Sequence, residues 1–99
     1  MEIKPDNILC HELIGLKVKI SSYPDLNLLG LEGVILWETA RTLEIESTRG
    51  RRVKVLKPGL ILLVELPTGE WVKVRGDHML GNPFDRAKRA LRGECSASF

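Results

Sequence analysis

Short stretches of alternating apolar and polar residues, separated by turn residues, constrain the fold of this chain more than any other feature. In residues 16–20, Leu16, Val18 and Ile20 alternate with two lysines. The same period of two recurs in residues 42–47 and 52–56, and it is typical of a strand that buries one face. The pattern predicts β-structure over the middle of the chain.

Neighbouring stretches are close enough to form hairpins. One pairs residues 33–38 with 42–47, and a second pairs residues 60–66 with 71–75 across a Pro-Thr-Gly turn. Five or six short strands at this spacing predict an all-β fold, a small antiparallel barrel or sandwich. Because the chain has 99 residues and is 43% hydrophobic, we expect one domain over residues 1–99.

The two ends of the chain predict helices on either side of this β-structure, which we place at residues 16–76. Asp6 is a suitable N-cap for a helix over residues 5–15, and Asn82 for a helix over residues 82–92. The second helix carries a narrow apolar stripe on an otherwise basic circumference. The tail, residues 94–99, is predicted to fray.

Two predicted strands are apolar on both faces, at residues 34–37 and 60–64. An antiparallel sheet normally exposes one face to water, so either a terminal helix of the chain or another protein is expected to cover them. The apolar residues that offer a partner-binding surface are Leu9, Leu13, Ile35 and Trp37. Covering the chain's own barrel is an equally good interpretation of these residues.

Charge is distributed unevenly along the chain, although its net charge is only +2. Residues 1–50 hold five basic against eight acidic residues, whereas residues 51–99 hold ten against five. One basic cluster, Arg51, Arg52, Lys54 and Lys57, lies on a predicted strand and its end. Further candidates are Lys73 and Arg75 on the last strand and Arg86, Lys88, Arg89 and Arg92 on the last helix. Together they predict a surface that binds a phosphate backbone; the alternative is a solvated surface of mixed charge.

Several functional classes find little support in the sequence. Its longest apolar run is too short to cross a bilayer, and without a visible export signal we expect a cytoplasmic protein with reduced Cys10 and Cys95. Cys10, His11 and Glu12 are adjacent, so on a helix they do not face one another as a catalytic triad would. Asp77-His78 is a weak candidate for hydrolysis, and two histidines without a ligand spacing predict no metal site. Few aromatics accompany the basic residues, which favours backbone contacts to structured RNA over base stacking.

A series of short motifs runs along residues 7–92 in a recognisable order. They are His11–Leu16, a Gly-x-x-Gly-Val segment at 30–34, Glu38–Leu43 followed by Ile45-Glu46, Val74–Asp77, and Leu80–Arg86. In this order and spacing they resemble the archaeal ribonuclease P protein component 1 family, the twenty-nine-kilodalton subunit family. The resemblance implies an Sm-like, strongly bent antiparallel barrel of about six strands with N- and C-terminal helices.

The resemblance also implies a function. Ribonuclease P is the ribonucleoprotein endonuclease that removes the 5′ leader from precursor tRNA. In this family the RNA subunit and its magnesium ions perform the hydrolysis, while the protein binds and stabilises the RNA and pairs with a zinc-ribbon subunit among other ribonuclease P proteins. Arg75 and Arg86 match the family's RNA-contact region, followed by Lys88 and Arg89. The isolated chain is expected to be non-catalytic and to hold no cofactor.

Two other functions fit the same strands. A ribosomal or translation-associated β-barrel would show a similar basic surface. A protein-interaction barrel of the Src-homology type would need an aromatic groove, for which Tyr23, Trp37 and Trp71 would have to cluster on one surface.

Overall fold

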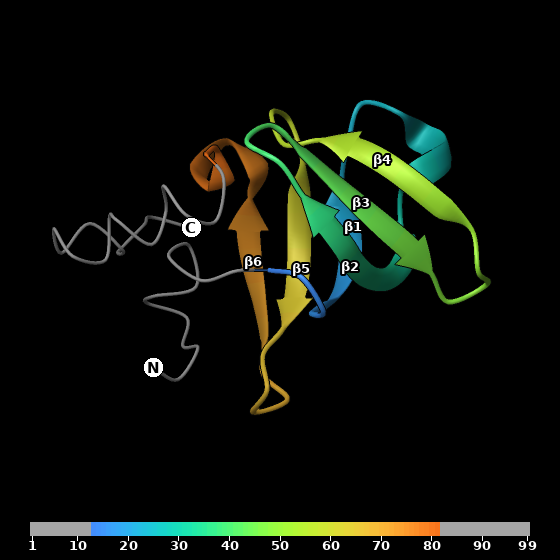
Figure 1. Cartoon of the computed structure of the whole chain (residues 1–99), viewed down its shortest axis with the longest axis vertical. Helices are drawn as coiled ribbons and strands as arrows, with labels where there is room; N and C mark the ends of the chain where they lie inside the picture. The colour runs from blue at the N-terminus through green and yellow to red at the C-terminus, as the bar shows by residue number, and fades with distance from the viewer. Residues whose placement is uncertain (1–12, 82–99) are drawn as a thin grey trace, which may run out of the picture.

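The alternating stretches form the strands of the molecule. A computed structural model describes residues 13–81 (Figure 1). The elements are β1 (Lys17–Ser22), the 3-10 helix η2 (Leu26–Leu28), β2 (Glu32–Glu38), β3 (Thr42–Ser47), β4 (Arg52–Leu56), β5 (Ile61–Glu65), β6 (Trp71–Arg75) and the 3-10 helix η3 (Gly76–Met79). No α-helix occurs within residues 13–81. The predicted all-β class is confirmed.

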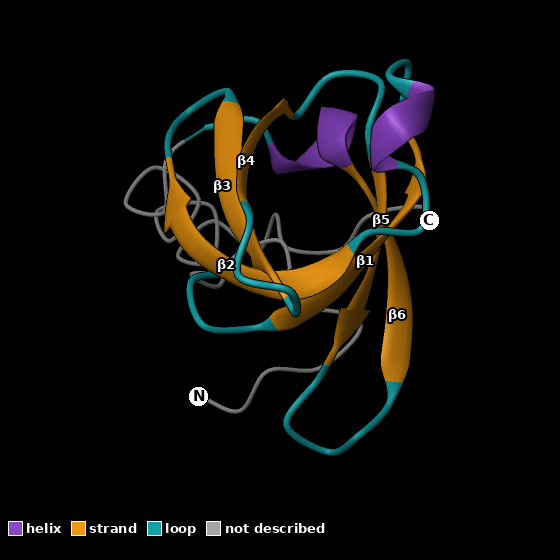
Figure 2. Ribbon diagram, turned by 90° about the vertical axis from the view of Figure 1, so that its right-hand side faces the viewer, coloured by secondary structure: helices purple, strands orange, loops and turns teal. Residues whose placement is uncertain are grey.

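The six strands form one antiparallel sheet in the order β4-β3-β2-β1-β5-β6. Both predicted hairpins are present, as β2–β3 and β5–β6. The sheet is open, because β4 and β6 lie at its two ends, yet it curls strongly enough to be barrel-like (Figure 2). The strand number and the bent, antiparallel character implied by the resemblance are therefore confirmed.

The predicted terminal helices lie largely outside the described residues. Of the helix expected over residues 5–15, residues 13–15 are described, and they form a turn rather than a helix. The helix expected over 82–92 and the tail at 94–99 fall beyond residue 81. In the part of the chain that the structure describes, no helix is both long and apolar enough to span a bilayer.

An irregularity in β2 decides which of its side chains face inward. Ile35 lies opposite Ile45, but Trp37 lies opposite Glu44, so Leu36 is an extra residue in the strand. A bulge of this kind bends the strand and shifts the alternation by one residue. As a result Ile35 is buried before the bulge and Glu38 after it, whereas Trp37 points outward with 57% of its surface exposed.

The core fills the inside of the curled sheet. The fully or almost fully buried apolar side chains come from every strand and from the segments around them: Leu13, Val18, Ile20, Leu28, Ile35, Leu43, Ile45, Val55, Leu60, Leu62, Val64, Leu66, Val72, Val74 and Met79. Burial of each large one stabilises the fold by about 1.5–3 kcal/mol. These residues form one cluster, so the sheet has a single core.

The end of β6 is joined to the segment after β4, although these two strands do not pair. The backbone N–H of Gly76 donates to the carbonyl of Leu60 at 2.6 Å. A Cβ at Gly76 would collide with the backbone carbonyl of Lys57, so only glycine fits this approach. Farther along, the N–H of Gly81 donates to the carbonyl of Ala40 at 2.9 Å. η3 thus closes one end of the curled sheet.

Candidate nucleic-acid interface

Apart from Lys57, the basic residues predicted to bind RNA from the strands are exposed. Alternation turns Arg52 and Lys54 of β4 outward while Val55 is buried, and it turns Lys73 and Arg75 of β6 outward while Val72 and Val74 are buried. Arg51, just before β4, is exposed as well. Because β4 and β6 are the first and last strands of the sheet and do not pair, these residues form two groups, one at each of these two strands. The continuous surface expected from the sequence also includes basic residues of the C-terminal helix, which lie outside the described residues, so it stays a prediction.

The two groups differ in how far carboxylates neutralise them. Arg52 pairs with Glu46 at 3.5 Å across β3 and β4, and Lys54 lies opposite Glu44. On β6, Lys73 lies opposite Leu63 and Arg75 opposite Ile61. Among residues 13–81, Arg51, Lys54, Lys73 and Arg75 form no ion pair, so their charge is available to an external anion.

The outer face beside β6 contains further basic residues. Lys19 of β1 lies opposite Leu63 of β5, which in turn lies opposite Lys73. Lys19 pairs with Glu32 at 3.6 Å, and Lys17 pairs with Glu65 at 3.9 Å. Both pairs are substantially exposed, and such pairs contribute little stability. A phosphate backbone competes readily for lysines held this way.

Lys57, which the sequence groups with the basic cluster, is not part of any surface. Its side chain is completely buried, and its ammonium donates to Glu38 Oε2 at 2.8 Å, to the Met79 carbonyl at 2.8 Å and to the Gly81 carbonyl at 3.0 Å. A charge inside a protein requires such partners. The prediction for Lys57 was therefore wrong, and its role is structural. Sequence analysis also missed Glu38, because only the bulge in β2 turns that side chain inward.

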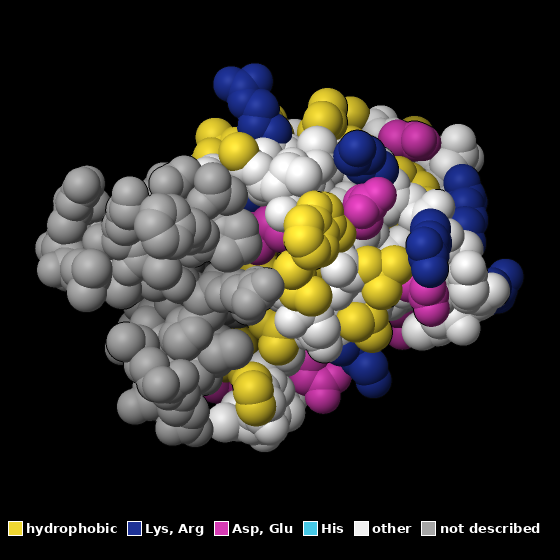
Figure 3. All heavy atoms as spheres, in the orientation of Figure 1, with side chains coloured by type: hydrophobic (Ala, Val, Ile, Leu, Met, Phe, Trp, Pro, Cys, Tyr) yellow, Lys and Arg dark blue, Asp and Glu magenta, His cyan; other side chains and the backbone are white. Residues whose placement is uncertain are grey.

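The residues proposed for partner binding are divided by the structure. Leu13 and Ile35 are 0% exposed and belong to the core, whereas Trp37 is exposed on the outer face of β2. Leu9 lies outside the described residues, as do Arg86, Lys88, Arg89 and Arg92. Val34, on the same strand as Trp37, is also exposed. Apolar side chains occupy the middle of the face seen in Figure 3.

The aromatic groove of a Src-homology barrel is not formed. Trp37 on β2 and Trp71 on β6 are separated in the sheet by β1 and β5. Tyr23 is partly buried, and its hydroxyl accepts a hydrogen bond from the Leu56 N–H at 3.0 Å, at the exposed edge of β4. The three aromatics therefore belong to different parts of the barrel.

Asp77 and His78 lie on η3 and do not form a catalytic pair. The Asp77 carboxylate accepts a hydrogen bond from the Gly59 N–H at 3.1 Å, which fastens η3 to the loop after β4. The buried Nδ1 of His78 has no hydrogen-bond partner in the described part of the chain. Within residues 13–81, no group of three or more metal-ligating side chains converges.

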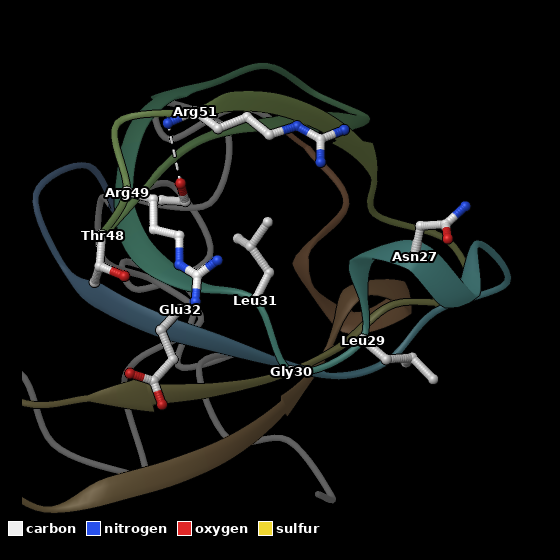
Figure 4. A pocket seen from close by; sticks show the side chains of 9 residues that line it. Asn27, Leu29, Gly30, Leu31, Glu32, Thr48, Arg49 and Arg51 are labelled. Atoms are coloured by element: carbon white, nitrogen blue, oxygen red, sulfur yellow. Dashed lines mark hydrogen bonds between the residues drawn. The ribbon is translucent and has the colours of Figure 1, made fainter.

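A hollow of about 470 Å³ opens between the β3–β4 turn and the segment before β2 (Figure 4). Arg49 and Arg51 line it from the turn, and Asn27 and Leu31 line it from the opposite side. Arg51 was predicted from the sequence as an RNA-binding residue, but Arg49 was not, because it lies in the half of the chain with a negative charge balance. The pair of arginines on either side of Gly50 is the sequence feature that could have identified Arg49 as a binding residue.

Comparisons with known proteins connect this fold and surface to one family. The sequence profile described as "Ribonuclease P/MRP, subunit p29" matches residues 6–89. The chain is 47% identical to ribonuclease P protein component 1 of Desulfurococcus amylolyticus, over 93% of the chain and 100% of that protein. It is 50% identical to the component of the same name from Staphylothermus marinus, over 87% of the chain and 94% of that protein.

Solved structures give the same result. The structure of Mth11, described as a homologue of human RNase P protein Rpp29, matches with a TM-score of 0.56 and 36% identity, over 77% of this chain and 97% of that one. The chain therefore belongs to the ribonuclease P/MRP subunit p29 family.

Proposed function

We propose that this chain is the RNA-binding protein subunit of ribonuclease P that binds and stabilises the RNA subunit. The observation that carries the proposal is the family match over residues 6–89, with relatives named ribonuclease P protein component 1 that align over almost their whole length. Ribonuclease P removes the 5′ leader from precursor tRNA. No comparison favours the ribosomal alternative.

The exposed cations support this proposal. Arg51, Lys54, Lys73 and Arg75 form no ion pair among residues 13–81, and they are exposed on β4 and β6 or, for Arg51, just before β4. Each contact to a phosphate releases a counterion, which lets RNA helices pack closely at lower magnesium. Two basic groups on one small barrel suit two RNA segments that the protein holds together.

We assign no catalytic step to the chain itself. The Asp77 carboxylate accepts from the Gly59 N–H, and within residues 13–81 it forms no hydrogen bond with His78, whose Nδ1 has no partner there. In this proposal the RNA subunit and its magnesium ions perform the hydrolysis, and the chain contributes binding and positioning.

The proposed partners are the ribonuclease P RNA, precursor tRNA within the holoenzyme, the zinc-ribbon subunit and other ribonuclease P proteins. The exposed Trp37 and Val34 on the outer face of β2 support a protein contact there, because exposed apolar side chains that lie together favour an interface. We place the assembly in the cytoplasm, where precursor tRNA is made in an archaeal cell.

Binding of the ribonuclease P RNA, measured as a dissociation constant over a range of salt concentrations, tests the proposal. A ribosomal RNA fragment of equal length serves as the competitor, and Arg41→Ala, an exposed arginine in the β2–β3 turn, serves as the control variant. We expect tighter binding to the ribonuclease P RNA, and a slope against log salt that falls by about two in Lys73→Ala/Arg75→Ala. Equal affinity for both RNAs, or an unchanged slope, would contradict the proposal.

A further inference from the structure

The hollow between the β3–β4 turn and the segment before β2 has the features of a site for an anion. Arg49 and Arg51 extend over it from the turn, with Leu31 at its floor (Figure 4). Neither arginine forms an ion pair with a carboxylate among residues 13–81. Arginine presents a planar fork of donors that binds phosphate oxygens two at a time. Two such forks at one opening form a site for a phosphate group.

The single carboxylate at the hollow does not cancel this charge. Glu32 lies at the rim, where Lys19 pairs with it at 3.6 Å. In Figure 4 its side chain extends away from the floor, whereas the Arg51 side chain crosses above it. The hollow therefore keeps the charge of both arginines.

Hydrogen bonds hold the two walls in place before any ligand arrives. The N–H of Thr48 donates to the Glu32 carbonyl at 3.0 Å, which joins the β3–β4 turn to the start of β2. Within the turn, the N–H of Arg51 donates to Ser47 Oγ at 3.0 Å, and Gly50 adopts a positive φ of 84°. Rigid walls reduce the entropy that binding costs.

The size and lining of the hollow suit more than a bare anion. Its volume of about 470 Å³ falls within the range of roughly 300–1,000 Å³ that is usual for small-ligand sites. Asn27, Ser47 and Thr48 add neutral hydrogen-bonding groups around the arginines. A phosphate and its attached sugar would satisfy both kinds of group. Figure 3 shows Lys and Arg side chains at the same end of the molecule, where β3 turns into β4.

We propose that this hollow, lined by Arg49, Arg51, Asn27 and Thr48, binds one phosphodiester unit of an RNA strand. The inference rests on the proposed function and adds a site to it, next to the exposed group on β4, with which the site shares Arg51. The two guanidinium groups bind the phosphate oxygens, and the neutral groups on the two walls, Thr48 on the turn and Asn27 opposite it, flank the rest of the nucleotide. The site binds one nucleotide at a defined position, in contrast to a broad basic surface.

The test uses the full chain, a labelled RNA hairpin as the probe, and amide NMR spectra for position. We expect the hairpin to shift the amide signals of Asn27, Thr48 and Gly50. Arg49→Ala/Arg51→Ala should bind it roughly tenfold or more weakly and lower the salt slope by about two. Arg41→Ala, which removes a single exposed arginine at the opposite end of β3, should stay within about twofold of the wild type. Arg49→Lys/Arg51→Lys should keep the salt slope of the wild type but bind the hairpin more weakly, because lysine does not form a bidentate contact with phosphate.

Other results would overturn the inference. One is a double alanine variant that binds the hairpin as tightly as Arg41→Ala does. Another is a hairpin that binds without shifting the amide signals of residues 27, 48 and 50. The third is a shift of these signals by poly-glutamate or by inorganic phosphate alone that is larger than the shift caused by the hairpin. These outcomes leave the proposed function intact if the wild-type chain still binds ribonuclease P RNA in a salt-dependent manner. Failure of the wild-type chain to bind that RNA would overturn both.

Discussion

Replacement of the buried lysine is the most demanding test of the fold. In Lys57→Met the side chain keeps a similar length but loses its ammonium group. Glu38 Oε2 and the carbonyls of Met79 and Gly81 therefore lose the donor that lies 2.8, 2.8 and 3.0 Å from them in the wild type. Both side chains of the ion pair are 0% exposed. Water therefore cannot replace the ammonium as the hydrogen-bond donor unless the core opens.

The expected loss follows from that burial. Removing one partner of a buried ion pair costs about 3–5 kcal/mol, because the remaining charge is left in the interior. A domain of this size is stable by only about 5–15 kcal/mol. Lys57→Met should therefore lose about a fifth of the stability or more, and its midpoint of thermal unfolding should fall by roughly 12 °C or more.

Urea unfolding followed by circular dichroism measures this loss, and two variants make it specific. Lys17→Met removes the lysine of an exposed pair, 3.9 Å from Glu65, and should cost at most about 1 kcal/mol. Glu38→Leu/Lys57→Met removes both buried charges and should recover much of the stability. A Lys57→Met protein within about 1 kcal/mol of the wild type, or a double variant that is less stable than Lys57→Met, would refute this account of the pair.

Three further predictions concern other parts of the chain. Gly76→Ala should lower the free energy of unfolding by about 1–3 kcal/mol, because the added Cβ would collide with the Lys57 carbonyl. Thermal unfolding measures this loss of stability, and a loss no larger than that of Arg75→Ala would contradict the prediction. Trp37→Ala should weaken binding of the zinc-ribbon subunit at least tenfold, measured by calorimetry, with little change in the stability of the chain. If Trp37→Ala and Trp71→Ala bind the zinc-ribbon subunit with equal affinity, the proposed contact at β2 is wrong. Arg86→Ala/Lys88→Ala/Arg89→Ala should lower the salt slope of RNA binding by about three, and a wild-type slope would remove these residues from the interface.

Local patterns were sufficient to predict the strands. Alternation over residues 16–20, 42–47 and 52–56 depends only on neighbours in the chain, and β1, β3 and β4 form there. The hairpins followed because short turns join adjacent strands. The resemblance to the ribonuclease P subunit was also carried by short motifs in order, and the family match confirms it.

Features that depend on distant contacts were not predictable in this way. The burial of Glu38 requires the bulge at Leu36, and nothing in the local pattern distinguishes a bulged strand from a regular one. From the local sequence, Lys57 is a cation at the end of a strand. Its burial depends on η3 and the residues after it, which supply the carbonyls of Met79 and Gly81. Arg49 gains its significance only when residues 27–32 pack beside the β3–β4 turn, twenty residues away in the sequence. The division of the basic residues between the first and last strands of the sheet likewise follows from strand order, which alternation does not encode.

Reconstituted cleavage of precursor tRNA tests the central claim most directly. The ribonuclease P RNA is combined with the zinc-ribbon subunit and the remaining proteins, with and without this chain, at several magnesium concentrations. We predict that adding the chain lowers the magnesium needed for cleavage, and that the chain without the RNA cleaves nothing. Magnesium-dependent cleavage by the RNA-free chain, abolished by Asp77→Ala, or a magnesium requirement indifferent to its presence, would contradict the claim.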